Sequence, residues 1–508
     1  MHQTESQAGT FALLCDPATH GGAPVRRIET HAAAVFLAGE RAYKVKRAVR
    51  FPFLDYSTLA QRKAACDAEL AVNRLSAPEI YLRVVAITRA HGRLALGGSG
   101  EPVEWAVEMR RFDESATLDR LADRGKIDAS LANALARAVV LAHARAPLAG
   151  AEPWIEMLAR VIAQNDTEFR ETPEIFPESA AAALARECSA ALDRVRPLLR
   201  ARGAQGLVRR GHGDLHLGNI ALIGGRPVLF DAIEFDPLIA SGDVLHDLAF
   251  LLMDLSERGL RQAANILLNR YLVEAGRDSN LDALAALPLF MSVRAAIRAK
   301  VTAARLENVS ATERAAITAR AQSYFQFARD LITPPAPRLI AIGGLSGTGK
   351  SALARALAPD LLPIPGAVLL RSDIERKILF GVGETARLPP EAYSAETTRK
   401  VYATLAGNAR RILAAGHSAI VDAVFAAPEE RAAIAEIGGP HFQGLFLIAD
   451  IDTRLARVRN RSGDASEADA RIARQQDSYD LGAMEWTKID ASGTPEGTLQ
   501  RVRGALAW

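Results

Sequence analysis

The stretch Gly344-Leu-Ser-Gly-Thr-Gly-Lys-Ser351 decides the fold of the C-terminal part of this sequence, because it fits the pattern G-x-x-x-x-G-K-[ST] at every fixed position. The apolar run Leu339–Ile342 before it has the composition of a short buried strand, and Ala352–Leu357 after it has that of a helix. A glycine-rich turn between a strand and a helix lets backbone N–H groups converge, and the N-terminus of the helix adds positive partial charge. The stretch therefore predicts a phosphate-binding loop in an α/β domain with a parallel sheet.

The loop contains a residue for each part of nucleotide binding. Gly344, Gly347 and Gly349 allow the backbone to approach the phosphates, Lys350 contacts the β- and γ-phosphates, and Ser351 ligates Mg²⁺. We therefore expect ATP and Mg²⁺ as cofactors. By average residue usage, the pattern arises by chance in roughly one to two chains in a hundred of this length. It is the strongest functional signal in the sequence.

Two further apolar runs downstream end in acidic residues. Leu369-Leu-Arg-Ser-Asp373-Ile-Glu-Arg376 reads as a strand ending in an acid, with an arginine one helical turn later, and Ala419-Ile-Val-Asp422 reads as a second buried strand. Asp373 has a structural alternative as the N-cap of a helix that begins at Ile374, and Asp422 as a residue that holds a turn. Four arginines follow, and their alternative is a solvated helix face: Arg454, Arg457, Arg459 and Arg461.

Over about residues 338–500 these features resemble the small P-loop kinases, such as gluconate kinase, the 5′-kinase domain of polynucleotide kinase and zeta-toxin-like enzymes. The resemblance implies that Asp373 is the base for an acceptor hydroxyl and that Arg376 binds the acceptor. It also implies a Walker-B-like metal position for Asp422 and a mobile lid that carries Arg457 and Arg461. An acid followed by an arginine favours phosphoryl transfer over bare hydrolysis.

A second group of polar residues lies in His212-Gly-Asp-Leu-His-Leu-Gly-Asn219 and in the strand-like run Arg226-Pro-Val-Leu-Phe-Asp231. Phosphoryl transfer from ATP needs one carboxylate to orient and deprotonate the acceptor hydroxyl. It also needs an amide oxygen and a second carboxylate to hold Mg²⁺ against the phosphates. Asp214, Asn219 and Asp231 supply these three groups. A simple turn is the alternative for the loop, and His212 and His216 lack the spacing of a zinc site.

This loop resembles that of the aminoglycoside phosphotransferase family, which has a kinase-like fold, and the match covers about residues 30–330. The resemblance implies that Lys44, in Arg41-Ala-Tyr-Lys44, grips the phosphates and that Glu69 on the following helix pairs with it. Lys46 lies on the same strand face, so either lysine could bind phosphate; a solvated basic edge and a surface position for Glu69 are the alternatives. Asp243 and Asp247 are expected to hold backbone groups. The strands expected here contain no clear glycine-rich loop, so nucleotide affinity could be modest or rest on Lys44 and the metal.

The segment Thr333-Pro-Pro-Ala-Pro337 marks the main domain boundary, because three prolines stop a helix and favour an extended spacer. We expect a kinase-like domain over residues 1–332, with a β-rich small lobe to about 112 and a helical lobe over 113–332. A P-loop kinase domain follows over 338–508. The fold class is an α+β bilobal kinase-like fold followed by an α/β P-loop fold. Strand-like runs and helices support the division: 33–37, 42–45, 81–87 and 105–109, and helices 59–74 and 310–330.

The composition fits a globular protein: 508 residues, 49% hydrophobic and 24% charged. Net charge is +3, from 62 basic and 59 acidic residues, which gives no general nucleic-acid footprint. Three scattered cysteines suit neither a disulfide framework nor a zinc cluster. The sequence also lacks a signal-like start and an apolar run of membrane-spanning length. These features predict a cytoplasmic protein.

Together, the motifs predict a tandem kinase, in which each domain transfers the γ-phosphoryl group of ATP to a hydroxyl of a small molecule. No residue run identifies either acceptor, and an oligonucleotide 5′-hydroxyl is not excluded. A second hypothesis makes one domain a nucleotide-binding regulator of the other. A third makes the P-loop domain an NTPase that drives conformational change. The resemblance to the phosphotransferase family does not imply antibiotic resistance, since a fold does not fix a substrate.

Overall fold

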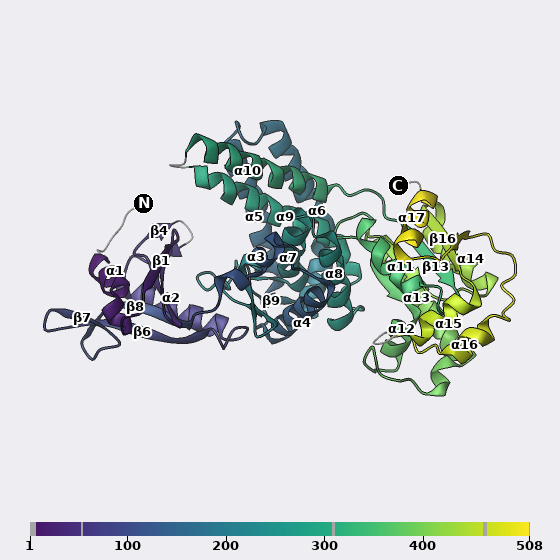
Figure 1. Cartoon of the computed structure of the whole chain (residues 1–508). Coiled ribbons are helices and arrows are strands. Elements are labelled where there is room, and N and C mark those ends of the chain that lie inside the picture. The colour runs from purple at the N-terminus through teal and green to yellow at the C-terminus, as the bar shows by residue number, and fades with distance from the viewer. Residues whose placement is uncertain (1–6, 52–53, 307–309, 461–464, 507–508) are drawn as a thin grey trace. The chain divides into compact units, whose positions relative to one another are not determined.

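A computed structural model describes residues 7–51, 54–306, 310–460 and 465–506 (Figure 1). The chain divides into two compact units: residues 1–164 with 196–254 form the first, and 165–195 with 255–508 form the second. The proline-rich segment 333–337 lies within the second unit, between α10 and β13. The domain limits given by the sequence stay predictions. In the described part of the chain, no helix is long and apolar enough to cross a membrane.

A six-stranded antiparallel sheet forms the N-terminal part of the first unit, with the order β1-β2-β3-β8-β6-β7. The predicted hairpin is present: β2 and β3 are joined by Gly39, which has a positive φ of 54°. Helix α2 (Leu59–Asn73) packs on β6 and β8 and begins with a capping box formed by Thr58 and Gln61. The strands are β1 (Val25–Glu29), β2 (Ala33–Ala38), β3 (Arg41–Lys46), β6 (Tyr81–Ala90), β7 (Arg93–Leu96) and β8 (Glu101–Arg110).

The rest of the first unit is mainly helical, with short strand pairs that frame a loop. Strands β9 and β12 pair antiparallel, as do β10 and β11, and the loop over residues 211–219 connects β9 to β10. The elements are α3 (Leu118–Asp123), α4 (Ala129–Arg145), β9 (Val208–Arg210), β10 (Ile220–Ile223), β11 (Arg226–Leu229), β12 (Ser241–Asp243) and α7 (Val244–Glu257). Helices α5 (Ala151–Arg170) and α6 (Glu178–Ala204) pass from one unit into the other. A small hairpin, β4 (Arg50–Phe51) with β5 (Leu54–Asp55), and helix α1 (Ala8–Cys15) complete this unit.

Helices α8 (Arg261–Glu274), α9 (Leu287–Ala303) and α10 (Ala311–Ile332) lie in the second unit before the proline-rich segment. Helices α9 and α10 lie side by side (Figure 1). The predicted capping box of α10 is confirmed, since Ser310 caps the N–H of Glu313 and the Glu313 side chain accepts from Ser310. A short helix over Asp282–Ala286 lies between α8 and α9.

A five-stranded parallel sheet forms the core of the C-terminal part, in the order β14-β15-β13-β16-β17. Every residue of the central strand β13 is buried, as expected where helices cover both faces of a parallel sheet. The strands are β13 (Leu339–Gly344), β14 (Val368–Arg371), β15 (Ala419–Asp422), β16 (Phe442–Ile448) and β17 (Thr487–Asp490). The helices are α11 (Lys350–Leu357), α12 (Ser372–Leu379), α13 (Ala395–Ala414), α14 (Pro428–Gly438), α15 (Ile451–Arg459), α16 (Ala470–Gln476) and α17 (Pro495–Ala505). The fold class predicted from the sequence is confirmed: a bilobal kinase-like fold precedes a P-loop fold with a parallel sheet.

Candidate functional sites

The glycine-rich loop connects β13 to α11, as predicted. Gly344, Gly347 and Gly349 have φ values of 139°, 88° and 95°, a region that favours glycine. A Cβ atom at Gly347 would lie 2.5 Å from the carbonyl oxygen of Arg454, and one at Gly344 would lie 2.7 Å from that of Leu447. Glycine is therefore required at both positions by conformation and by space, and the loop backbone is shaped to approach a ligand closely.

Ser351 and Asp422, both predicted metal ligands, are in contact at the ends of neighbouring elements. The Ser351 hydroxyl donates to Asp422 Oδ2 at 2.5 Å, and Asp422 is 4% exposed. A hydroxyl and a carboxylate at one point are hard oxygen ligands of the kind that Mg²⁺ prefers, so these residues fit the metal. The Lys350 ammonium donates to the carbonyl oxygen of Leu345 at 3.2 Å, which keeps it beside the loop.

Arg371 belongs to this site, although sequence reasoning missed it. Its Nη2 lies 3.2 Å from the Ser351 hydroxyl oxygen and its Nε lies 3.4 Å from Asp422 Oδ2. Arg371 ends β14 and pairs in parallel register with Asp422 at the end of β15. Arg371 could have been identified from its position as the last residue of a predicted strand, because the carboxyl ends of neighbouring parallel strands meet at one edge of the sheet.

The structure distinguishes between the arginines of α15. Arg454 is 2% exposed and donates to the carbonyl oxygens of Ser346 and Ala473 at 3.0 and 2.8 Å, so it anchors the loop and is not part of a solvated face. Arg457 lies against the loop, with Nη1 3.4 Å from the carbonyl oxygen of Thr348. The predicted lid residue Arg461 falls outside the described residues.

Asp373 and Arg376 lie on α12, directly after β14. The helix begins at Ser372, with Arg371 in the N-cap position, so Asp373 lies in its first turn and is not the N-cap. The Arg376 guanidinium donates to the carbonyl oxygen of Ala392 and lies 5.1 Å from the Tyr393 ring centroid. Burial lowers the pKa of Arg376. Arg376 therefore holds the segment before α13, and its predicted contact with an acceptor stays a prediction.

In the first unit, Lys44 joins two of the predicted site residues. Its Nζ lies 2.7 Å from Glu69 Oε1 and 2.6 Å from Asp231 Oδ1. Glu69 is fully buried, so it is not a surface residue of α2. Burial opposes the charge of Lys44, but Asp231 and Glu69 outweigh it and raise the pKa of Lys44 well above its ordinary value. Lys44 is therefore a cation held between two carboxylates.

Lys46 occupies a different environment from Lys44. It is 2% exposed, lies 2.6 Å from Glu69 Oε2, and donates a hydrogen bond to Glu234. Tyr56 also donates to Glu234, at 2.8 Å. Lys44 thus reaches the predicted metal ligand Asp231, whereas Lys46 pairs with Glu234. This difference favours Lys44 as the lysine that binds phosphate.

Asp231 has an unusual backbone conformation that fixes its side chain. Its φ is 62°, which is rare for a residue with a Cβ, and its N–H donates to the Tyr81 hydroxyl oxygen at 3.1 Å. The N–H of the preceding residue, Phe230, donates to the carbonyl oxygen of Asn219 at 3.0 Å. Backbone strain of this kind concentrates at functional sites, where the surrounding structure imposes it.

The loop between β9 and β10 brings Asp214 and Asn219 together. Asn219 Nδ2 donates to Asp214 Oδ2 and to the Asp214 carbonyl oxygen, both at 3.0 Å. The Asp214 side chain is 41% exposed, whereas Asn219 is 9% exposed. The amide oxygen of Asn219 and the carboxylate of Asp231 are ligands suited to Mg²⁺, so the residues present fit that metal here too.

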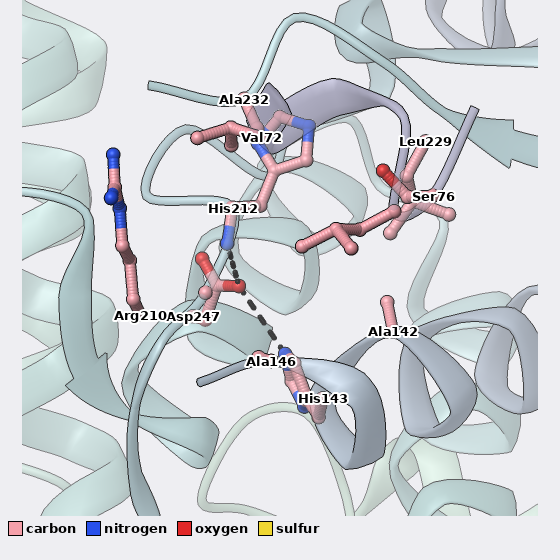
Figure 2. Close-up of a pocket in the computed structure, with 12 residues that line it drawn as sticks. Val72, Ser76, Ala142, His143, Ala146, Arg210, His212, Leu229, Ala232 and Asp247 are labelled. Carbon is pink, nitrogen blue, oxygen red and sulfur yellow. Dashed lines mark hydrogen bonds and ion pairs between the residues drawn. The ribbon is translucent and has the colours of Figure 1, made fainter. Parts of the chain in front are cut away.

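Asp247 holds the backbone of this loop from below (Figure 2), as predicted. It accepts the N–H groups of His212 and Gly213 at 2.9 and 3.0 Å and lies 3.2 Å from His143 Nε2. Burial opposes its charge, but the contacts with His143 and His212 lower the pKa of Asp247. A cavity of about 40 Å³ adjoins these side chains, and Arg210 also lines it. Asp243 likewise accepts the N–H of Leu245, at 2.8 Å.

The comparisons with known proteins treat the C-terminal part and the whole chain in turn. Residues 339–481 match the family described as an AAA domain, which confirms the prediction of a P-loop domain in this part. The chain is 30% identical over 484 residues to uncharacterized protein Rv2004c of Mycobacterium tuberculosis (strain H37Rv) and to uncharacterized protein Mb2027c of Mycobacterium bovis. Each match covers 92% of both chains, and this chain belongs to the family of these proteins.

Solved structures resemble the two parts of the chain separately. A gluconokinase from Sinorhizobium meliloti 1021 is 18% identical, with a TM-score of 0.25, over 34% of this chain and 93% of its own. A choline/ethanolamine kinase family protein from Mesorhizobium loti is 15% identical, with a TM-score of 0.36, over 64% of this chain and 97% of its own.

Proposed function

We propose that this chain is a bifunctional ATP-dependent phosphotransferase, with one site in each of its two folds. The observation that carries the proposal is that each site contains a lysine together with side-chain oxygens of the kind that Mg²⁺ prefers. In the first site these are Lys44 with Asn219 and Asp231, and in the second Lys350 with Ser351 and Asp422. Both sites also contain a carboxylate, Asp214 or Asp373, of the residue type that serves as a base, which simple nucleotide binding does not need.

In the first site, Lys44 binds the phosphates of ATP and Glu69 keeps its ammonium group in place. Asp214 orients the acceptor hydroxyl and accepts its proton while the hydroxyl oxygen attacks the γ-phosphorus. The bond from the γ-phosphorus to the bridging oxygen breaks, and ADP leaves with the electron pair. Bound Mg²⁺, held by Asn219 and Asp231, would neutralise phosphate charge.

In the second site, the glycine-rich loop and Lys350 bind the β- and γ-phosphates, with Arg457 beside the loop. Ser351 and Asp422 would hold Mg²⁺. Asp373 takes the proton of the second acceptor hydroxyl, and Arg376 contributes to the acceptor side. The acceptors are small molecules with hydroxyl groups; the near-neutral net charge gives no reason to favour an oligonucleotide.

A screen of acceptors with the full-length chain tests the proposal. Sugars, nucleosides, polyol phosphates and aminoglycosides would be added singly with Mg·ATP, and ADP release would be followed. We expect at least one acceptor whose phosphorylation is lost in Asp214→Asn alone, and another whose phosphorylation is lost in Lys350→Ala alone. Acceptor-independent ADP release across all four classes would overturn the proposal.

A regulatory role for the first unit is the second candidate function. It is favoured by the turn between β1 and β2, residues 30–32, which contains no glycine and so lacks a close backbone approach to phosphates. In that case ATP would bind the first site and change the turnover of the second. Asp214→Asn would then leave all transfer intact, whereas Lys44→Met would alter the rate of ADP release at the second site.

A further inference from the structure

Strand β14 lies at the edge of the five-stranded sheet, and the outward-facing backbone groups of Leu369 in this strand have partners outside the sheet. On its inner side β14 pairs with β15. An edge strand leaves alternate N–H and C=O groups without a strand partner, and such groups need water or another part of the chain. Here the partners come from α8 and from Arg277, which follows this helix in the chain.

The contacts satisfy backbone groups of Leu369 in β14 and of Ala367 directly before the strand. The N–H of Leu369 donates to Asn269 Oδ1 at 2.6 Å, and the Leu369 carbonyl oxygen accepts from Arg277 Nη2 at 2.9 Å. The carbonyl oxygen of Ala367 accepts from Asn265 Nδ2 at 3.0 Å and from Asn269 Nδ2 at 3.1 Å. Asn265 and Arg277 are buried, so these hydrogen bonds replace solvent at the edge. The P-loop sheet is therefore completed by side chains that precede it in the sequence.

Arg277 also forms a buried ion pair with Glu375 of α12. The exposed fractions of the two side chains are 7% and 3%, so neither charge can be hydrated instead. Leu369 lies in β14, and Glu375 lies in α12, the helix whose first turn contains Asp373. One guanidinium group thus contacts both the strand that precedes the predicted base and the first turn of the helix that contains it.

A second chain of charges extends from α8 toward the phosphate loop. Arg270 Nη1 lies 2.7 Å from Glu384 Oε2, and Glu384 Oε1 lies 3.8 Å from Arg371 Nη1. Arg371 in turn contacts the hydroxyl of Ser351. Burial, and then the charge of Arg371, lowers the pKa of Arg277 to about 10.

We propose that Arg277 is a positioning residue of the P-loop site: by holding Leu369 and Glu375, it fixes the turn that presents Asp373. The helical segment before the P-loop domain is then a working part of that domain's active site. The kinetic part of this inference rests on the proposed function of the second site. The structural part, the protection of the β14 edge, does not.

The test uses three full-length variants: Arg277→Met, Arg277→Lys and the matched control Arg411→Met. Arg411 on α13 also contacts the segment between α8 and α9, with its Nε 2.9 Å from Asp282 Oδ1. The Arg411 side chain is more exposed than that of Arg277, and its acidic partners are Asp278 and Asp282. Three quantities would be measured: hydrogen exchange at the Leu369 amide, the Kd of a fluorescent Mg·ADP analogue, and ADP release at saturating Mg·ATP per folded molecule. For the last two, only the part that Lys350→Ala removes is assigned to the second site.

We expect Arg277→Met to speed exchange at Leu369 and to slow ADP release, each by about tenfold, with a change in Kd below about threefold. The rate should change more than the affinity because the glycine-rich loop, which binds the phosphates, connects β13 to α11. The contacts of Arg277 described above are instead with β14 and α12. Arg277→Lys should have a rate between those of Arg277→Met and wild type. Lysine keeps the positive charge opposite Glu375, but its single ammonium group cannot replace the planar guanidinium that contacts both Glu375 and the Leu369 carbonyl oxygen. Arg411→Met should change none of the three.

Unchanged exchange and unchanged ADP release in Arg277→Met would overturn the inference. So would equal losses of affinity and rate in Arg277→Met and Arg411→Met, because that pattern belongs to a purely structural contact. If Arg277→Met does not fold, Arg277→Lys carries the same test. Failure of the proposed function gives a different result from failure of this inference, because wild type and Lys350→Ala would then release ADP equally slowly. Hydrogen exchange at Leu369 would still decide whether Arg277 protects the β14 edge.

Discussion

Replacing Glu69 by glutamine perturbs the centre of the first site with the least change in shape. The carboxylate is fully buried and lies 2.7 Å from the Lys44 ammonium and 2.6 Å from that of Lys46. Glutamine removes the negative charge but keeps the volume. Each lysine then retains a single carboxylate partner, Asp231 or Glu234.

The expected loss of stability follows from the burial of this cluster. Removing one partner of a buried ion pair costs about 3–5 kcal/mol, and we expect about 3 kcal/mol here because both lysines keep a second partner. For a unit of this size, that loss lowers the thermal midpoint by about 6–12 °C. The affinity of the first site for Mg·ATP should fall by about tenfold, since Lys44 loses the group that orients it.

A matched control separates stability from function. Glu104 is 1% exposed and accepts from Arg62 Nε at 2.9 Å, so Glu104→Gln breaks another buried ion pair of the same unit. We expect Glu104→Gln to lower the midpoint by a similar amount and to leave nucleotide affinity per folded molecule unchanged. Equal effects of both variants on affinity, or a cost of less than about 1 kcal/mol for Glu69→Gln, would refute this reasoning.

The pH dependence of stability gives a second readout of the same residue. Burial opposes the charge of Glu69, but Lys44 and Lys46 outweigh it and hold its pKa below the ordinary value of 4.5. A depressed carboxyl pKa contributes stability that is fully present above the unfolded value and is lost as the pH falls through the folded value. Thermal midpoints of wild type and Glu69→Gln should therefore differ most at neutral pH and converge below pH 4.5.

Three further predictions concern the other site residues. Lys350→Ala in the full-length chain should abolish most ATP turnover at the second site, because losing the charge partner of the phosphates costs several kcal/mol in the transition state; single-turnover assays check this. Asp214→Asn should lower transfer at the first site by about 10² or more with nucleotide affinity kept, whereas Asp231→Asn should weaken Mg²⁺-dependent binding; equal losses of binding in both would contradict the division of roles. Asp373→Ala should suppress transfer at the second site with ATP affinity nearly intact, and unchanged transfer per folded molecule would remove Asp373 as the base.

Local patterns were sufficient to predict the main elements of the fold. The glycine-rich loop, the strands around it and the hairpin at Gly39 depend on residues that are near one another in the sequence. The capping box of Ser310 and Glu313 is equally local. The boundary of α12 was harder, since it begins at Ser372 and includes Asp373 in its first turn. Several residues before and after Asp373 suit either a cap or a first turn, so propensity alone did not place the helix start.

Long-range contacts explain what the sequence left open. Lys44 and Lys46 lie two residues apart on the same face of one strand, so the local sequence does not distinguish them. They differ because Lys44 pairs with Asp231 and Lys46 pairs with Glu234, and both carboxylates lie far along the chain. Arg454 looked like any arginine of a solvated helix, but the packing of α16 and the phosphate loop buries it. The role of Arg277 depends on an edge strand that follows it by more than ninety residues. No periodicity within one segment carries that information.

The number of Mg·AMPPNP molecules bound per chain tests the central claim, that one chain holds two separate sites for Mg·ATP, most directly. Isothermal titration of the full-length wild type should give two sites. Lys350→Ala should lose the site formed by the glycine-rich loop, and Lys44→Met should lose the other, because each removes the cation that binds the phosphates. A single site in the wild type, lost in Lys350→Ala and unaffected in Lys44→Met, would contradict the account.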